Sequence, residues 1–169
     1  MALHQVDLER ASYRFSPGRA HTLVEAKAAN IRTAFLCHSH LDEELAKGLV
    51  TVLAEQGISL YVDWADQSMP ATPNRTTAAK IQDRIRTCDL FLLLATKNSM
   101  ASRWCPWEIG YADGIKLVRN ILIIPTVDAS GIYHGNEYLQ LYRKIDGASL
   151  NALQVFDPAS SIGTSIRYL

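Results

Sequence analysis

The sequence lacks the long apolar runs that a membrane-spanning helix needs. Its longest uninterrupted apolar stretch, residues 90–95, has six residues, whereas a spanning helix needs about 20. The N-terminal residues also lack the apolar core of a secretory leader. We therefore expect a protein with no membrane partner that works in the cytoplasm.

Cysteine is scarce, and neither sign of charge is in excess. The three cysteines, Cys37, Cys88 and Cys105, do not have the spacing of metal ligands. Their odd number argues against a secreted disulfide framework, so we expect reduced thiols. Lys and Arg total 17, and Asp and Glu also total 17. This balance gives no electrostatic reason to expect nucleic acid or an anionic membrane as a partner.

Apolar segments of strand length alternate with helical patterns along most of the chain. The expected strands are residues 33–37, 58–62, 89–95, 121–127 and 154–156. The expected helices are residues 21–29, 41–56, 76–86 and 137–145, with a further helix around Glu108. This alternation predicts a parallel sheet with right-handed crossovers. We predict an α/β fold with a flavodoxin-like, doubly wound sheet of five parallel strands in the order 2-1-3-4-5.

The two ends of the chain have weaker patterns than its centre. Residues 1–30 are expected to form an N-terminal extension with a short helix, packed on the rest and without chemistry of its own. Residues 31–169 are expected to form the main domain, and residues 158–169 are expected to be its tail.

A polar turn and a helix start follow the third predicted strand, within residues 99–110. Trp104 and Glu108 are four residues apart, so on a helix they would share a face. Pro106 is tolerated only in a first helical turn, which places the helix start after Ser102 and Glu108 near that start. Open α/β sheets bind ligands at the carboxyl ends of their strands, where the strand order reverses. Trp104 would place an aromatic plane beside the carboxylate of Glu108 at this edge. We therefore expect a pocket there for a flat ring joined to a sugar.

This motif, S-x-W-C-x-x-E after a hydrophobic strand, resembles the TIR (Toll/interleukin-receptor) domain. The likeness is to the NAD-cleaving members from plants and bacteria, the bacterial ones including Thoeris-like anti-phage immune proteins. It runs from about Arg32 to the C-terminus. It implies an NAD+ glycohydrolase or cyclase in which Glu108 is catalytic and Trp104 stacks on a ring of NAD+. The products would be nicotinamide and either ADP-ribose or a cyclic isomer that acts as an immune signal.

The chemistry of NAD+ is compatible with a single catalytic carboxylate. Most glycosidases use two, because one must protonate a poor leaving group. The nicotinamide of NAD+ is a cationic ring that departs neutral, so Glu108 alone could stabilise the positive charge that develops on the ribose. No Gly-rich dinucleotide fingerprint follows any predicted strand. We therefore expect NAD+ as a substrate and no cofactor.

Polar residues after the first two predicted strands are further candidates for substrate binding. They are His38, Ser39, Asp42, Asp63 and Trp64. The pair His38 and His40 could instead chelate zinc, but no further ligand is evidently placed, so we expect no metal. In the TIR family the connection after the second strand mediates self-association, which assigns that role to residues 64–74. By the same resemblance, a separate effector protein would sense the product.

Less specific interpretations of these residues remain open. Glu108 could be a helix-start glutamate that favours the helix dipole or pairs with Arg103, and Trp104 could be a core residue. Trp107 lies on another face of the expected helix and is predicted to be core. Two alternative functions therefore stand beside NAD+ cleavage: a non-enzymatic TIR adaptor acting by self-association, and a related nucleoside glycosyl- or deoxyribosyl-transferase.

Overall fold

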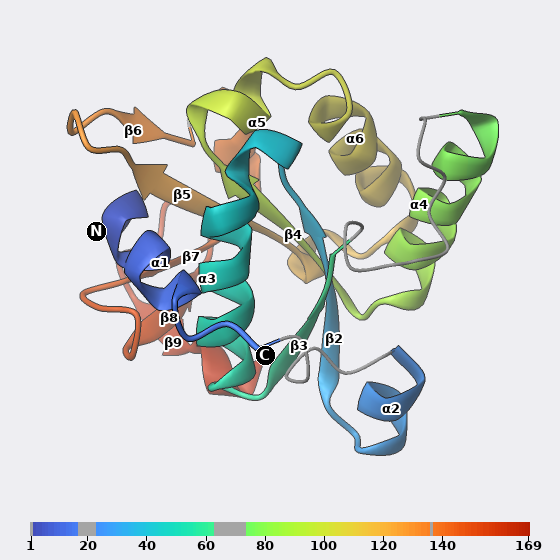
Figure 1. The fold of residues 1–169 in the computed structure, drawn as a ribbon, viewed down its shortest axis with the longest axis horizontal. Helices are drawn as coiled ribbons and strands as arrows, with labels where there is room; N and C mark the ends of the chain where they lie inside the picture. The colour runs from blue at the N-terminus through green and yellow to red at the C-terminus, as the bar shows by residue number, and fades with distance from the viewer. Residues whose placement is uncertain (1, 17–22, 63–73, 136) are drawn as a thin grey trace.

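The computed structural model describes residues 2–16, 23–62, 74–135 and 137–169, and shows a central sheet with helices on both faces (Figure 1). Its parallel strands lie side by side in the order β3 (Ile58–Tyr61), β2 (Arg32–Cys37), β4 (Leu90–Ala95), β5 (Ile121–Val127) and β7 (Arg143–Gly147). Read in chain order, these strands are arranged 2-1-3-4-5. The predicted flavodoxin-like α/β fold is therefore confirmed.

Helices and short strands complete the fold. The α-helices are α1 (Gln5–Ser12), α2 (Leu23–Ala28), α3 (Glu43–Ala54), α4 (Arg75–Thr87), α5 (Lys97–Ala101) and α6 (Cys105–Ile115). The 3-10 helices are η2 (His40–Asp42), η4 (Val118–Asn120), η5 (Glu137–Leu141) and η6 (Ile166–Tyr168). The remaining strands are β1 (Leu3–His4), β6 (Tyr133–His134), β8 (Leu153–Phe156) and β9 (Gly163–Ser165). Among the described residues, no helix is both long enough and apolar enough to cross a bilayer.

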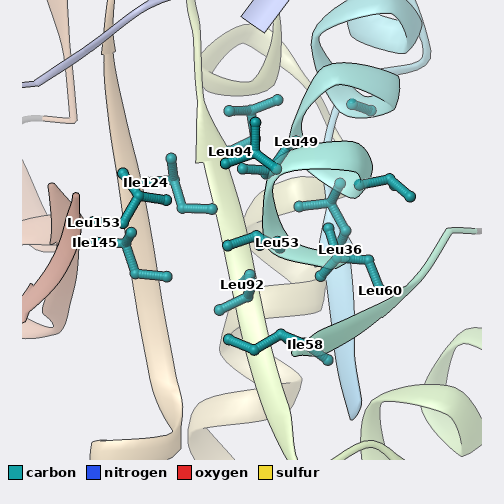
Figure 2. Packing of buried hydrophobic residues seen from close by; sticks show 14 of the residues in the cluster. Leu36, Leu49, Leu53, Ile58, Leu60, Leu92, Leu94, Ile124, Ile145 and Leu153 are labelled. Carbon is teal, nitrogen blue, oxygen red and sulfur yellow. The ribbon is translucent and has the colours of Figure 1, made fainter. Parts of the chain in front are cut away.

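The central strands are apolar on both faces because helices cover both faces. Leu36, Leu92 and Ile124 point to one side, where they pack with α1 and α3; Figure 2 shows these strand residues around Leu49 and Leu53 of α3. Their sequence neighbours point to the other side and pack with α4 and α6; they include Phe35, Cys37, Phe91, Leu93 and Ile123. This period of two, which is the period of a strand, divides the core into two layers.

The fifth parallel strand is not the segment that the sequence predicts. The expected helix at residues 137–145 is a short η5 followed by β7. Leu139 enters the core, but Leu141 is 67% exposed, so the apparent helical stripe is not a buried face. Backbone pairing of β7 with both β5 and β8 decides the strand conformation. The predicted strand at residues 154–156 exists as β8, and it runs antiparallel beside β7.

The two chain ends carry more structure than the sequence predicts. The N-terminal segment adds β1, which pairs with β5, and α1, whose Leu8 and Ala11 join the core on the α3 side. The expected helix at residues 21–29 is seen as α2, within the described part of that range. The expected C-terminal tail holds β9, which pairs with β8, and η6, whose Ile166 is buried. The segment predicted as a tail therefore extends the sheet by one strand and contributes a residue to the core.

Candidate functional site

The candidate site lies at the carboxyl edge of the sheet, between β2 and β4. These two strands are paired, with Cys37 opposite Leu93 near their ends. The chain leaves β2 toward β3 on one side and leaves β4 toward β5 on the other, so the strand order reverses between them. In doubly wound sheets this is where the crevice for a ligand forms. Figure 1 shows the start of α3 and the α5–α6 segment near this same edge of the sheet.

A short helix, α5, separates β4 from the helix that carries Glu108. Thr96 caps α5: its hydroxyl accepts from the backbone N–H of Ser99, and the Ser99 hydroxyl in turn bonds to the N–H of Thr96. The chain then turns at Ser102, whose hydroxyl accepts from the N–H groups of Trp104 and Cys105. The sequence predicts only a polar turn here. Thr96 and Ser99 form a capping box in which a serine stands where the usual sequence signature has Glu or Gln, so that signature is not present in the sequence.

Helix α6 begins at Cys105, with a proline in its first turn and Glu108 also in that turn. This confirms the expected helix start. Glu108 is only 7% exposed, and it belongs to an inward stripe that also includes Cys105, Ile109 and Ala112. A carboxylate in the first turn is stabilised by the positive end of the helix dipole. The site therefore contains a nearly buried carboxyl group on a fixed helical turn.

The wall beneath Glu108 is the end of strand β2. The Sγ atom of Cys37 lies 4.0 Å from the carbonyl oxygen of Cys105, and both cysteines are buried. Burial, a hydrogen bond to Cys105, and the charge of Glu108 raise the pKa of the Cys37 thiol well above its usual value. Sequence analysis did not assign Cys37 to the site, and only its position at a strand end could have suggested it.

Three aromatic rings follow one another along the outer side of α6. The Trp104 and Trp107 rings meet edge to face with centroids 5.4 Å apart, and Trp107 stacks on Tyr111 at 6.3 Å. Trp104 and Trp107 are each 37% exposed. The prediction that Trp107 is a core residue is therefore wrong, because Trp107 lies outside the inward stripe of α6. Trp104 presents ring surface next to the helical turn of Glu108.

The segment after β2 supplies three more predicted site residues, His38, Ser39 and Asp42. His38 is partly buried, with Nδ1 3.2 Å from the carbonyl oxygen of Leu36. Ser39 is buried and caps η2, where its hydroxyl accepts from the N–H of Leu41. The structure places both residues directly after the end of β2.

Asp42 is buried, and both of its carboxylate oxygens are engaged by the segment after β4. Oδ2 accepts from the Thr96 hydroxyl at 2.5 Å, and Oδ1 accepts from the Asn98 amide at 2.6 Å. Asp42 therefore ties the start of α3 to the start of α5. Neither Thr96 nor Asn98 was a predicted site residue, since their partner is more than fifty positions earlier in the chain.

The remaining predicted site residues cannot be placed. Asp63, Trp64 and all but the last residue of the 64–74 segment lie outside the described residues. Asn74 itself caps α4, with Oδ1 accepting from the N–H groups of Thr76 and Thr77. In the described ranges, His, Cys, Asp and Glu side chains do not gather in groups of three or more that could hold a metal ion.

Comparisons with known proteins gave the following matches. Residues 34–155 match the family model described as "TIR domain". The chain is 34% identical over 154 residues to a protein of Bacillus cereus (strain MSX-D12) named "Probable 3' cyclic ADP-D-ribose synthase ThsB'", covering 85% of this chain and 79% of that protein. It is 26% identical over 81 residues to "Putative cyclic ADP-D-ribose synthase TIR2" of Cytobacillus dafuensis, covering 46% of this chain and 21% of that protein.

Proposed function

The chain belongs to the TIR domain family, and from this premise we propose that it is an enzyme that cleaves NAD+ between nicotinamide and ribose. The products are nicotinamide and a cyclic ADP-ribose isomer, with ADP-ribose where water intercepts the reaction. One observation carries the proposal: Glu108 is held nearly buried in the first turn of α6, beside the exposed ring of Trp104, at the ligand edge of the sheet. The names of both relatives support the same reaction.

Glu108 supplies the charge that the reaction needs. As the bond to nicotinamide breaks, positive charge develops on the ribose, and a fixed carboxylate stabilises it. The departing nicotinamide becomes neutral, so no general acid is required. The helix dipole favours the ionised form of a carboxyl group in the first turn of α6. One carboxylate is therefore sufficient in this mechanism.

The other residues of the edge bind and orient NAD+, which is a substrate here and not a cofactor. Trp104 provides a flat surface for a ring of the substrate, and aromatic stacking of a base is worth about 1–3 kcal/mol. His38 and Ser39 form part of the pocket wall after β2, and Asp63 and Trp64 are proposed to approach from the end of β3. Asp42 acts differently, because its carboxylate already binds Thr96 and Asn98. It holds two walls of the pocket together.

Signalling follows from the nature of the product. A cyclic ADP-ribose isomer is small and diffusible, so a separate effector protein would sense it in an anti-phage response. We place the reaction in the cytoplasm, where NAD+ is abundant. The 34% identical relative is named as a 3' cyclic ADP-D-ribose synthase, so the 3' isomer is the first product to look for. Self-association through residues 64–74 would complete the pocket.

The experiment is an assay of purified protein with NAD+, with the products separated by chromatography. We expect nicotinamide and a cyclic isomer. An adaptor would release neither, and a nucleoside transferase would require a second base as acceptor. Glu108→Gln should lower kcat by about a hundred- to a thousand-fold, as does loss of one preorganised electrostatic contact. NAD+ binding and the thermal midpoint should change little, since glutamine has nearly the same volume.

A matched control is available on α1. Glu9 is exposed there, on a helix that packs against α3 and away from α6. Glu9→Gln should keep full activity. If folded Glu108→Gln protein cleaves NAD+ as fast as the wild type, the proposed role of Glu108 is wrong, and Asp63 becomes the next carboxylate to test.

A further inference from the structure

We propose that Cys37 is a positioning residue for Glu108: its thiol shares its single proton between the carbonyl oxygen of Cys105 and the Glu108 carboxylate, and this fixes the carboxylate against the end of β2. This inference rests on the proposed function, because it gives Glu108 a catalytic task. It concerns a group that is fully buried at the end of β2. Cys37 itself does not contact NAD+ in this arrangement.

The Cys37 thiol and the Glu108 carboxyl group both belong to the buried contact between the end of β2 and the first turn of α6. Cys37 is the last residue of β2 and is fully buried. Its Sγ is 4.0 Å from the carbonyl oxygen of Cys105, the first residue of α6. Residues three apart on a helix share a face, so Cys105 and Glu108 both point toward β2, and both are buried. The thiol thus lies against the helical face from which the Glu108 side chain projects.

The charge state of Cys37 suits a donor and does not suit a nucleophile. Burial, together with the hydrogen bond to Cys105 and the nearby charge of Glu108, holds the pKa of the thiol well above neutral pH. Cys37 therefore keeps its proton. A thiol is a weak donor, but a buried carboxylate is costly unless hydrogen bonds satisfy it. A neutral donor also leaves the negative charge of Glu108 available to the reacting ribose.

Holding one oxygen of Glu108 would leave the other oriented toward the substrate. Misplacement of a catalytic group by about 1 Å can cost up to a hundred-fold in rate. Loss of the donor should therefore lower kcat, while KM for NAD+ should stay within about two-fold. A residue that only filled space would instead be replaced best by an apolar side chain of similar volume.

Two substitutions of Cys37 separate these roles. Cys37→Ser keeps a donor of similar size, and Cys37→Val keeps apolar volume without a donor. We expect the serine variant to retain most of kcat and the valine variant to lose about ten-fold or more. If the valine variant is as active as the wild type and the serine variant is the impaired one, Cys37 is a packing residue and the proposal is wrong.

The matched control is Cys88→Val. Cys88 is also buried, and burial raises the pKa of its thiol to about 12. It lies at the junction of α4 and β4, where its carbonyl oxygen accepts from Lys116, away from the ligand edge. The Cys88 variant should keep wild-type kcat. Thermal midpoints of all three variants identify any loss that is due to unfolding.

An infrared measurement tests the contact without relying on activity. Thiol S–H stretching bands lie where no other protein group absorbs, and deleting each cysteine in turn assigns its band. Replacing Glu108 by alanine should shift the Cys37 band and leave the Cys88 band in place. An unshifted Cys37 band would overturn the proposal even if NAD+ cleavage is confirmed. Absence of NAD+ cleavage in the wild type would instead contradict the proposed function, whatever the band does.

Discussion

At the scale of single residues, Trp104 offers an exposed ring next to a carboxylate that is nearly buried. The two side chains are four positions apart, yet Trp104 is 37% exposed and Glu108 is 7% exposed. Trp104 is the N-cap residue of α6, and Glu108 lies inside the first turn on the stripe of α6 that is buried. These exposures are compatible with the separate roles proposed for the two residues, binding for Trp104 and chemistry for Glu108.

Substitution of Trp104 should affect substrate capture more than chemistry. Trp104→Ala removes the stacking surface, so we expect KM for NAD+ to rise about ten-fold or more, with a smaller fall in kcat. Trp104→Phe keeps an aromatic plane and should recover much of the loss. Tyr13→Ala is the control, since Tyr13 is exposed at the end of α1. Steady-state kinetics measure all three, and an unchanged KM in Trp104→Ala would contradict the stacking role.

At the scale of elements, helices α1 and α3 pack so closely that one position requires glycine. Gly48 is buried in α3, and a Cβ atom built on it would lie 1.9 Å from the carbonyl oxygen of Leu8 in α1. A backbone atom cannot move aside as a flexible side chain can. The N-terminal segment therefore contributes to the core through a contact that the glycine permits.

Alanine at position 48 should destabilise the protein, although alanine normally favours a helix. Glycine to alanine in a helix interior gains about 1 kcal/mol, but overpacking costs about 1–3 kcal/mol, so we expect a net loss in the free energy of unfolding. Gly114→Ala in α6 is the matched control: nothing lies within 4 Å of its added Cβ, and the helix should gain stability. Urea unfolding curves measure both. A stabilised Gly48→Ala protein would show that α1 does not pack on α3 as described.

At the scale of the whole molecule, we expect activity to depend on self-association. A head-to-tail contact in which residues 64–74 of one subunit complete the pocket of the next can propagate along a filament. Specific activity should therefore rise with protein concentration, because in this arrangement a subunit without a neighbour would have an incomplete pocket. Activity per molecule that stays constant on dilution to monomer would contradict this prediction.

Mixing two inactive variants gives a sharper form of the same test. One variant carries Glu108→Gln and keeps its own 64–74 segment. The other keeps Glu108 but has residues 66–72 replaced by glycine and serine. A mixed assembly contains intact pockets, so the mixture should regain activity that neither variant has alone. Ile132→Ser, which removes an exposed apolar side chain outside this segment, should leave both the activity and its concentration dependence unchanged.

The sequence by itself determined four of the five parallel strands and the start of the helix that carries Glu108. The central strands are recognisable because burial on both faces requires nearly every residue to be apolar, as in β4, where all six are buried. Pro106 restricts the start of α6 because a missing N–H is harmless only in a first turn. Both signals are local, because the residues of the strand or of the helix start are themselves sufficient to identify it.

Only the tertiary structure decided which side chains meet at the site and how the far edge of the sheet is built. Asp42 meets Thr96 and Asn98, and Cys37 meets Cys105, across more than fifty intervening residues in each case. Residues 143–147 form a strand because β5 and β8 pair with them on either side. Contacts between distant segments depend on how helices and strands pack together, and no local pattern of residue types specifies them.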